Sequence, residues 1–517
     1  MSKGDNLSDE GQAPGTILPG IEHVVVLMFE NRSFDNVLGG LYPEKSQQEY
    51  DGLNEQQCIP DCSDSDPSTV CTWQAPYGLE AMTMPYPDPG ELFEDMNEQI
   101  FGPGCAWETE TMRGFACNYV KQDASPDGVQ PAAQNIMQYY APGDGGNIPI
   151  TTALARAYAV SDRWFASGPV QTLANRIFAH CGTPGRYRDA QGVWRAVIDN
   201  TDITNQYTDP DGSVTLDTVF RLLDQAAQSK QWPWPDRLPW KVYYHDWPLS
   251  AFIEYVDDNW SSVYGGNVDP FKSPFYEDAA DFFYDVANDL PTYCFIEPRY
   301  TDYFGGSPNS NHPGGSTIDE NPPAISVCDG ELLLQTVYTT LYNGPNNLFE
   351  KTLLIVTYDE HGGLYDHAAP RPAPSPYQAG EVEGFNYDRY GVRVPAIFIN
   401  PLIRPNTIFR PLLGERPFDH TSIIRTLREQ FGLGGPLTPR DAAAPALRGL
   451  IDRNNLLNPF SPADLPAITC PPPAAAQVPP AALRTEPRPH SIAAAIKKAV
   501  LSPRNQARVR RLQGPKA

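Results

Sequence analysis

Five segments of the chain consist almost entirely of apolar, β-branched and aromatic residues. They are 23–29 (HVVVLMF), 241–246 (KVYYHD), 292–298 (TYCFIEP), 352–360 (TLLIVTYDE) and 396–401 (AIFINP). Strands of this composition are covered on both faces, as in the parallel sheets of α/β proteins. The pattern therefore predicts a central, mostly parallel sheet.

Between these segments, apolar residues recur at helical spacing. The clearest stretches are 150–165 (ITTALARAYAVSDRWF) and 330–343 (GELLLQTVYTTLYN), and both are predicted to form helices that cover the sheet. The 54 prolines and 40 glycines indicate long loop insertions between the elements. The fold class expected from these patterns is α/β.

Composition divides the chain into three parts. Residues 1–20 are polar and Gly-rich and are predicted to be flexible, residues 21–461 carry the patterned segments and form the catalytic domain, and residues 462–517 are a Pro/Ala-rich linker followed by a basic tail. The N-terminus has no apolar core of a Sec signal peptide, and no apolar run reaches the length of a membrane span. We therefore expect a cytoplasmic protein, with export by a non-Sec route as the alternative.

The net charge of −25 argues against a nucleic-acid partner, since phosphate backbones bind basic surfaces. The same charge disfavours anionic membranes, except at the basic C-terminal tail. Three alternatives stand for that tail: peripheral membrane contact, a flexible solvated segment, or folding back onto the acidic body. The sequence does not indicate an oligomeric state.

The nine cysteines are an odd number in a large chain, which favours reduced thiols over a full disulfide framework. Cys58, Cys62 and Cys71 lie close together. A zinc site needs a fourth ligand that this stretch does not offer, so a loop with a disulfide is the preferred interpretation.

Two of the predicted strands end in acidic residues. Glu30 and Asn31 follow 23–29, and Asp359 and Glu360 end 352–360. Ligands of open α/β sheets bind beyond the carboxyl ends of the strands. Three carboxylates and an amide oxygen that meet there would repel one another without a cation, and oxygen ligands suit Ca²⁺, Mg²⁺, Mn²⁺ or Zn²⁺. Helix capping or a loop salt bridge remains the alternative for each pair.

Thr172 lies in a turn flanked by Gly and Pro, ahead of Asn175 and Arg176. A threonine hydroxyl needs a base or a metal to become a nucleophile. A threonine at such a position is also a common helix cap, and this alternative remains open.

Six ordered motifs resemble the phosphoesterase family of non-specific phospholipases C and related acid phosphatases. They are FENRSFDNVLGG (29–40), QTLANRIF (171–178), TYDEHGGLYDH (357–367), YGVRVPAIFINP (390–401), FDHTSIIRTLREQFG (418–432) and LTPRDAA (437–443). The resemblance implies an alkaline-phosphatase-like α/β/α fold and a metal-dependent phosphoesterase that works through a phosphothreonine intermediate. It implies Glu30, Asn31, Asp359 and Glu360 as metal ligands and Thr172 as the metal-bound nucleophile.

The resemblance also implies roles for two of the eight histidines. His312, in NSNHPGG, corresponds to the family histidine that binds phosphoryl oxygens or protonates the leaving group. His245 corresponds by position to a second phosphate-binding histidine, with a structural histidine as the alternative. For His361, His367 and His420 a supporting or packing role is expected.

The chain departs from the family motifs at three places. Glu91 stands where a phosphate-facing histidine is expected, Ser310-Asn311-His312-Pro313 lacks an acid, and the turn before Thr172 is extended. A carboxylate repels phosphate by roughly 1 kcal/mol or more at about 4 Å. The substrate could therefore be a phospholipid, a soluble phosphate ester, or an ester with a cationic group facing Glu91. A catalytically reduced phosphate-binding protein is the remaining alternative.

Overall fold

A mixed eight-stranded sheet lies at the centre of the computed structural model, which describes residues 16–62, 68–78, 80–104, 109–125, 128–143, 145–202, 216–253, 264–265, 282–301, 307–314, 326–470 and 492–501. The strand order is β11-β10-β12-β1-β13-β14-β6-β15. Within this sheet only β14 runs against the other strands. The strands are β1 (His23–Phe29), β6 (Ala159–Val160), β10 (Trp240–Tyr244), β11 (Tyr264–Gly265), β12 (Tyr293–Glu297), β13 (Thr352–Tyr358), β14 (Ala396–Ile399) and β15 (Thr407–Ile408).

All five strands predicted from apolar composition are confirmed. Every residue of β1 and of β13 is buried, as expected for strands covered on both faces. These two strands are parallel neighbours, and Phe29 at the end of β1 pairs in register with Tyr358 at the end of β13. The acidic pairs that follow the two strands therefore leave the sheet side by side.

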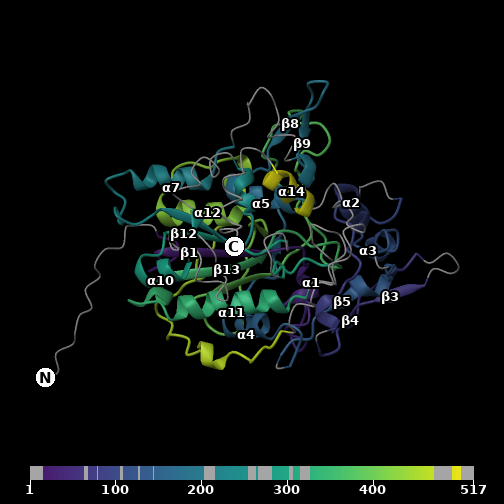
Figure 1. The fold of residues 1–517 in the computed structure, drawn as a ribbon, viewed down its shortest axis with the longest axis horizontal. Helices are drawn as coiled ribbons and strands as arrows, with labels where there is room; N and C mark the ends of the chain where they lie inside the picture. The colour runs from purple at the N-terminus through teal and green to yellow at the C-terminus, as the bar shows by residue number, and fades with distance from the viewer. Residues whose placement is uncertain are drawn as a thin grey trace, which may run out of the picture.

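Helices cover both faces of the sheet and make an α/β/α sandwich (Figure 1). One layer contains α5 (Thr172–Cys181), α7 (Val219–Ala227) and α12 (Thr421–Phe431), and the other contains α4 (Pro149–Ala157), α10 (Phe282–Asn288) and α11 (Cys328–Tyr342). The helix predicted over 330–343 is confirmed as α11. The helix predicted over 150–165 was too long: α4 ends at Ala157, and the remainder forms β6 and β7 (Trp164–Phe165).

Smaller elements surround the sandwich. Those between residues 58 and 140 form a group beside α1, which follows directly after β1 (Figure 1). The remaining strands and helices are α1 (Phe34–Val37), β2 (Cys58–Pro60), β3 (Thr69–Cys71), β4 (Trp73–Gln74), β5 (Gln138–Tyr139), α2 (Phe93–Phe101), α3 (Phe115–Tyr119), β8 (Arg186–Arg188), β9 (Trp194–Ala196), β16 (Phe418–Asp419), α13 (Pro439–Ala443) and α14 (Ile492–Leu501). Short 3₁₀ turns are η1 (Glu80–Thr83), η2 (Ala133–Met137), η3 (Leu249–Phe252), η4 (Leu348–Lys351) and η5 (Pro462–Asp464).

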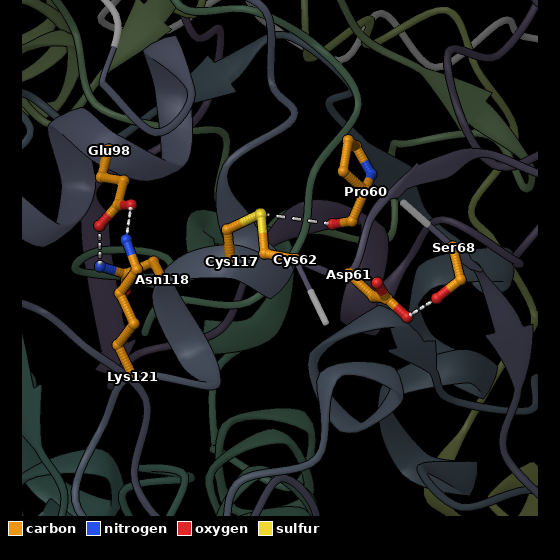
Figure 2. Close-up of a disulfide and its surroundings, with 8 residues drawn as sticks. All are labelled: Pro60, Asp61, Cys62, Ser68, Glu98, Cys117, Asn118 and Lys121. Carbon is orange, nitrogen blue, oxygen red and sulfur yellow. Dashed lines mark hydrogen bonds and ion pairs between the residues drawn. A yellow bond between two sulfur atoms is a disulfide. The ribbon is translucent and has the colours of Figure 1, made fainter. Parts of the chain in front are cut away.

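The prediction of reduced thiols is wrong for six cysteines, which form three disulfides, whereas Cys181 and Cys294 are free and buried. Cys58 pairs with Cys71, Cys62 with Cys117, and Cys328 with Cys470. Figure 2 shows the second bond, which fastens the loop before β3 to α3. Because all three clustered cysteines are oxidised, the disulfide interpretation of 58–71 is confirmed and the zinc alternative is excluded.

Both terminal segments make contacts that composition did not indicate. Leu18 is fully buried and its backbone N–H donates to Gln430, so the ordered chain begins before residue 21. At the other end, Cys470 is tied to α11, and Ile492 and Ile496 of α14 are buried in the main core. The rest of the predicted tail lies outside the described residues. Among those residues, no helix combines the length and apolar character needed to span a bilayer.

Candidate active site

Asn31 and Asp359 meet at the carboxyl edge of the sheet. The Asn31 backbone N–H donates to Asp359 Oδ1 at 3.0 Å, and the Glu360 N–H donates to the same oxygen at 2.7 Å. Asn31 has a left-handed backbone with φ of 57°, a conformation that non-glycine residues adopt mainly at functional sites and turns. A Cβ at Gly362 would lie 2.2 Å from the Asn31 carbonyl oxygen. The glycine after the acidic pair is therefore required for this close approach.

Glu30 and Glu360 carry buried oxygens that are short of hydrogen-bond donors, although the Ser310 side chain approaches the Glu30 carboxyl group. Within the described part of the chain, neither Oε1 nor Oε2 of Glu30 accepts a hydrogen bond of ordinary geometry, and neither does Oε1 of Glu360. Both side chains are fully buried. Buried carboxylates without partners are costly, and a bound cation would compensate them. The carboxylate oxygens of Glu30 and Glu360 are therefore of the chemical type that binds a divalent metal.

The electrostatics agree with this fit. Burial raises the pKa of Glu30 to about 8, although His312 opposes the shift. Burial, followed by the charges of Glu91 and Asp359, raises the pKa of Glu360 well above its ordinary value. Both pKa values are raised mainly because burial removes the carboxyl groups from water.

The predicted ligands are nevertheless not gathered into one compact group. In the described residues, the acid and histidine groups with ligand atoms within 4.8 Å of one another are Asp35, Asp366, His367 and, separately, Asp88, Glu91, His312. Glu30, Asp359 and Glu360 do not form such a group. Two of these acids have competing partners, because Asp359 Oδ2 pairs with Arg176 and Glu360 Oε2 accepts from the Gly362 N–H.

Thr172 is the first residue of α5 and points at Asn31. Its hydroxyl donates to Asn31 Oδ1 at 3.2 Å, and its side chain is buried. Gln171, not Thr172, is the N-cap residue, so the capping alternative does not describe Thr172. The position at a helix N-terminus favours anionic groups near its hydroxyl.

Arg176 was not assigned to the site from the sequence, whereas His420 was expected in a supporting or packing role. Arg176 lies one helical turn after Thr172, pairs with Asp359 Oδ2 at 3.0 Å, and donates to the carbonyl oxygens of Met28 and Phe29. His420 Nε2 lies 2.6 Å from the Asp359 carbonyl oxygen. The four-residue spacing of Thr172 and Arg176, which places both on one helix face, was the available signal.

Glu91 stands within the site. Its Oε1 accepts from the Asn31 side-chain amide at 2.6 Å and lies 3.5 Å from His312 Nε2. Asp88 Oδ1 lies 3.8 Å from His312 Nδ1. Burial opposes protonation of His312, but the charges of Glu91 and Asp88 raise its pKa well above the ordinary value. Glu91 therefore places a carboxylate between the Asn31 amide and His312.

The other histidines have separate partners. His245, at the end of β10, pairs through Nδ1 with the Asn309 side chain at 2.8 Å, three residues before His312. His361 Nε2 lies 2.7 Å from the oxygen of Gln99 on α2. His367 contacts Asp35 and Asp51. These contacts link His245 to the His312 loop but do not show it at a phosphate site.

Known proteins resemble the chain over most of its length. Non-specific phospholipase C1 from Arabidopsis thaliana is 30% identical over 449 residues, which cover 84% of this chain and 71% of that protein. Phospholipase C A from Mycobacterium tuberculosis is 30% identical over 449 residues, covering 82% and 75%. Together with the Thr172 hydroxyl and the acidic residues at the edge of the α/β sheet, these matches identify the chain as a phosphoric ester hydrolase. More narrowly, the chain belongs to the phosphoesterase family, whose model matches residues 21–434.

A solved structure of a protein in the alkaline phosphatase superfamily from Vibrio parahaemolyticus matches with a TM-score of 0.33 and 12% identity, covering 58% of this chain and 64% of that chain. A TM-score at this level is too low for structural inference. The α/β/α class therefore rests on the sheet order and on the two helix layers.

Proposed function

We propose that the protein hydrolyses phosphate esters with a divalent metal and through a phosphothreonine at Thr172. One observation carries the proposal. The Asn31 side chain accepts a hydrogen bond from the Thr172 hydroxyl, and the Asn31 backbone N–H donates to Asp359. This joins the nucleophile to the acidic edge of the sheet.

The metal would be held by five oxygen-bearing groups: Glu30, Asn31, Asp359, Glu360 and the Thr172 hydroxyl. Ca²⁺, Mg²⁺, Mn²⁺ and Zn²⁺ all accept such oxygen ligands. When bound, the ion would supply positive charge that acidifies the hydroxyl and neutralises the phosphoryl oxygens. The buried oxygens of Glu30 and Glu360 support this assignment.

The chain's own residues would perform both chemical steps. Thr172 Oγ1 releases its proton to solvent and forms a bond to phosphorus as the ester P–O bond breaks, and the leaving-group oxygen takes a proton from His312. Water then attacks the phosphorus of the phosphothreonine and gives a proton back to His312. The bond from phosphorus to Thr172 Oγ1 breaks, which releases phosphate or a phosphorylated headgroup, and the threonine hydroxyl regains its proton from solvent. The raised pKa of His312 is consistent with an acid that is protonated at neutral pH.

Glu91 and His245 belong to the proposed substrate site. Glu91 fixes the Asn31 amide so that Oδ1 faces Thr172, and its charge disfavours simple phosphate dianions beside His312. A phosphodiester carries less charge than a monoester, and a cationic headgroup would be attracted. The names of the relatives, phospholipases C, agree with a phospholipid substrate. His245 remains a prediction as a second phosphate contact.

The test is turnover of a nitrophenyl phosphate monoester against the matching phosphorylcholine diester, with chelator and after adding back each ion. We expect chelator-sensitive turnover and a preference for the diester. Turnover that resists exhaustive chelation would contradict metal dependence, and the absence of turnover on both esters and on phospholipid would favour the binding-protein alternative.

The disulfides bear on location. Cytosolic proteins rarely keep structural disulfides, so the three bonds favour an exported protein in an oxidising location over the cytoplasmic expectation. Thiol alkylation of the protein in freshly lysed native cells tests this. Labelling of Cys58, Cys71, Cys328 and Cys470 would show a reducing location.

A further inference from the structure

The loop of residues 409–417, between β15 and β16, exposes two consecutive leucines. Leu412 is 62% exposed and Leu413 is fully exposed at 106%. Exposed leucines are common on protein surfaces, so the meaning of this pair depends on where its loop lies relative to the site.

The loop is a defined projection. The Glu415 N–H donates to the Leu412 carbonyl at 2.9 Å, and the Glu415 carboxylate accepts from the Leu412 N–H at 3.0 Å. Gly414 has a φ of +91° at the third position of this turn, where glycine is favoured. At the base, the rings of Phe409 and Phe418 stack with centroids 5.6 Å apart. The leucines are thus held at the tip and away from the body.

The sheet topology places this loop at the edge that carries the acids. β15 is parallel to β6, and β6 has the same direction as β13 because both are antiparallel to β14. The carboxyl end of β15 therefore lies at the same edge of the sheet as the carboxyl end of β13, which Asp359 follows. The two strands are three positions apart, about 14 Å at the usual strand spacing.

A second leucine pair lies at the opposite edge and provides a matched control. Leu456 and Leu457 are 92% and 50% exposed. The next residue, Asn458, donates its N–H to Pro401 O at 2.7 Å. Pro401 follows the end of β14, which is the antiparallel strand, so this pair faces away from the acidic edge.

The charges around the loop tip indicate which kind of lipid bilayer the loop could contact. Arg410 pairs with Asp162, and Arg416 is exposed beside Glu415, so the tip is close to neutral on a protein of net charge −25. An anionic bilayer would repel the body. A zwitterionic bilayer would not, and it would bury the leucine side chains.

We propose that Leu412 and Leu413 insert into a zwitterionic phospholipid surface and bring the Thr172 edge to lipid headgroups. This inference rests on the proposed phospholipid substrate. It does not use the apolar side of α14, since Ile492, Ala495 and Ile496 of that helix are buried.

The experiment compares the full chain with the double variants Leu412→Ser/Leu413→Ser and Leu456→Ser/Leu457→Ser. Binding to phosphatidylcholine vesicles is measured by co-sedimentation, and turnover is measured on the same vesicles and on a soluble phosphodiester. We expect the loop variant to bind vesicles at least about tenfold more weakly and to lose vesicle turnover in proportion, with soluble turnover unchanged. The control variant should match the wild type in all three measurements.

Vesicle binding by the loop variant equal to that of the wild type would overturn the proposal, as would a wild type that does not bind vesicles. Equal losses in both variants, or a loop variant that loses only self-association, would also overturn it. If the wild type binds through the loop but cleaves only soluble esters, the docking inference stands and the phospholipid substrate fails.

Discussion

Glu91 accepts a hydrogen bond from the Asn31 side-chain amide at 2.6 Å, and the oxygen of the same amide receives the Thr172 hydroxyl. Glu91 thus also orients the residue that contacts Thr172, the proposed nucleophile. Its removal is expected to have separable effects on charge and on geometry.

Glu91→Gln tests the charge alone, because the glutamine oxygen can still accept from Asn31. We expect a KM for a phosphate monoester that falls by up to about tenfold, since one repulsive charge is lost, with little change in kcat. Glu91→His should also raise activity toward simple phosphate esters. Steady-state kinetics measure both, with exposed Glu94→Gln on α2 as the control. An unchanged or higher KM in Glu91→Gln would show that Glu91 does not face the phosphate.

Glu30→Gln tests the metal site through stability. A divalent ion at 100 times its Kd should stabilise the wild type by roughly 2.7 kcal/mol. The variant should lose this shift while keeping the fold, because the changed oxygens make no ordinary hydrogen bond within the described residues. Thermal melts with and without each ion measure the effect, with exposed Glu44→Gln as the control. An ion-dependent shift that persists in Glu30→Gln would remove this residue from the ligand set.

The surroundings of His367 predict that the free energy of unfolding decreases as the pH becomes alkaline. Burial opposes its protonation, but the charge of Asp35 and hydrogen bonds to Asp35 and Asp51 raise its pKa to about 10 from 6.5. The imidazolium therefore stabilises the fold fully below about pH 6.5, and this contribution is lost as the pH rises toward 10.

His367→Gln should accordingly destabilise the protein by roughly 1.5–3 kcal/mol at pH 6. The difference in the free energy of unfolding between the variant and the wild type should disappear by pH 10. Urea unfolding at both pH values checks this. A gap that stays constant between pH 6 and pH 10 would show that the charge of His367 is not involved.

The sequence predicted the sheet and the acidic edge because both depend on local pattern. β1 and β13 are unbroken apolar strands, and their register brings Glu30 and Asp359 to one edge without further information. Thr172 was found through its turn and motif. The structure places it against Asn31.

Other features depend on contacts between distant segments. Arg176 joins Asp359 across 183 residues of sequence, and the apolar run 150–165 does not show where α4 yields to β6. The disulfide between Cys328 and Cys470 spans 142 residues, and cysteine spacing alone does not determine connectivity. Convergence of the acids around a metal likewise depends on side-chain positions that no spacing encodes.

The covalent role of Thr172 is the central claim, and trapping tests it most directly. The enzyme is mixed with a phosphate ester, quenched in acid during the first turnover, and digested for peptide mass spectrometry. We predict one phosphoryl group on Thr172 that forms and decays fast enough to account for kcat. Thr172→Ser should keep some turnover, and Thr172→Ala should lose it by a factor on the order of 10³ or more. A Thr172→Ala variant that turns over at the wild-type rate, with no phosphorylated Thr172 in the wild type, would contradict the account.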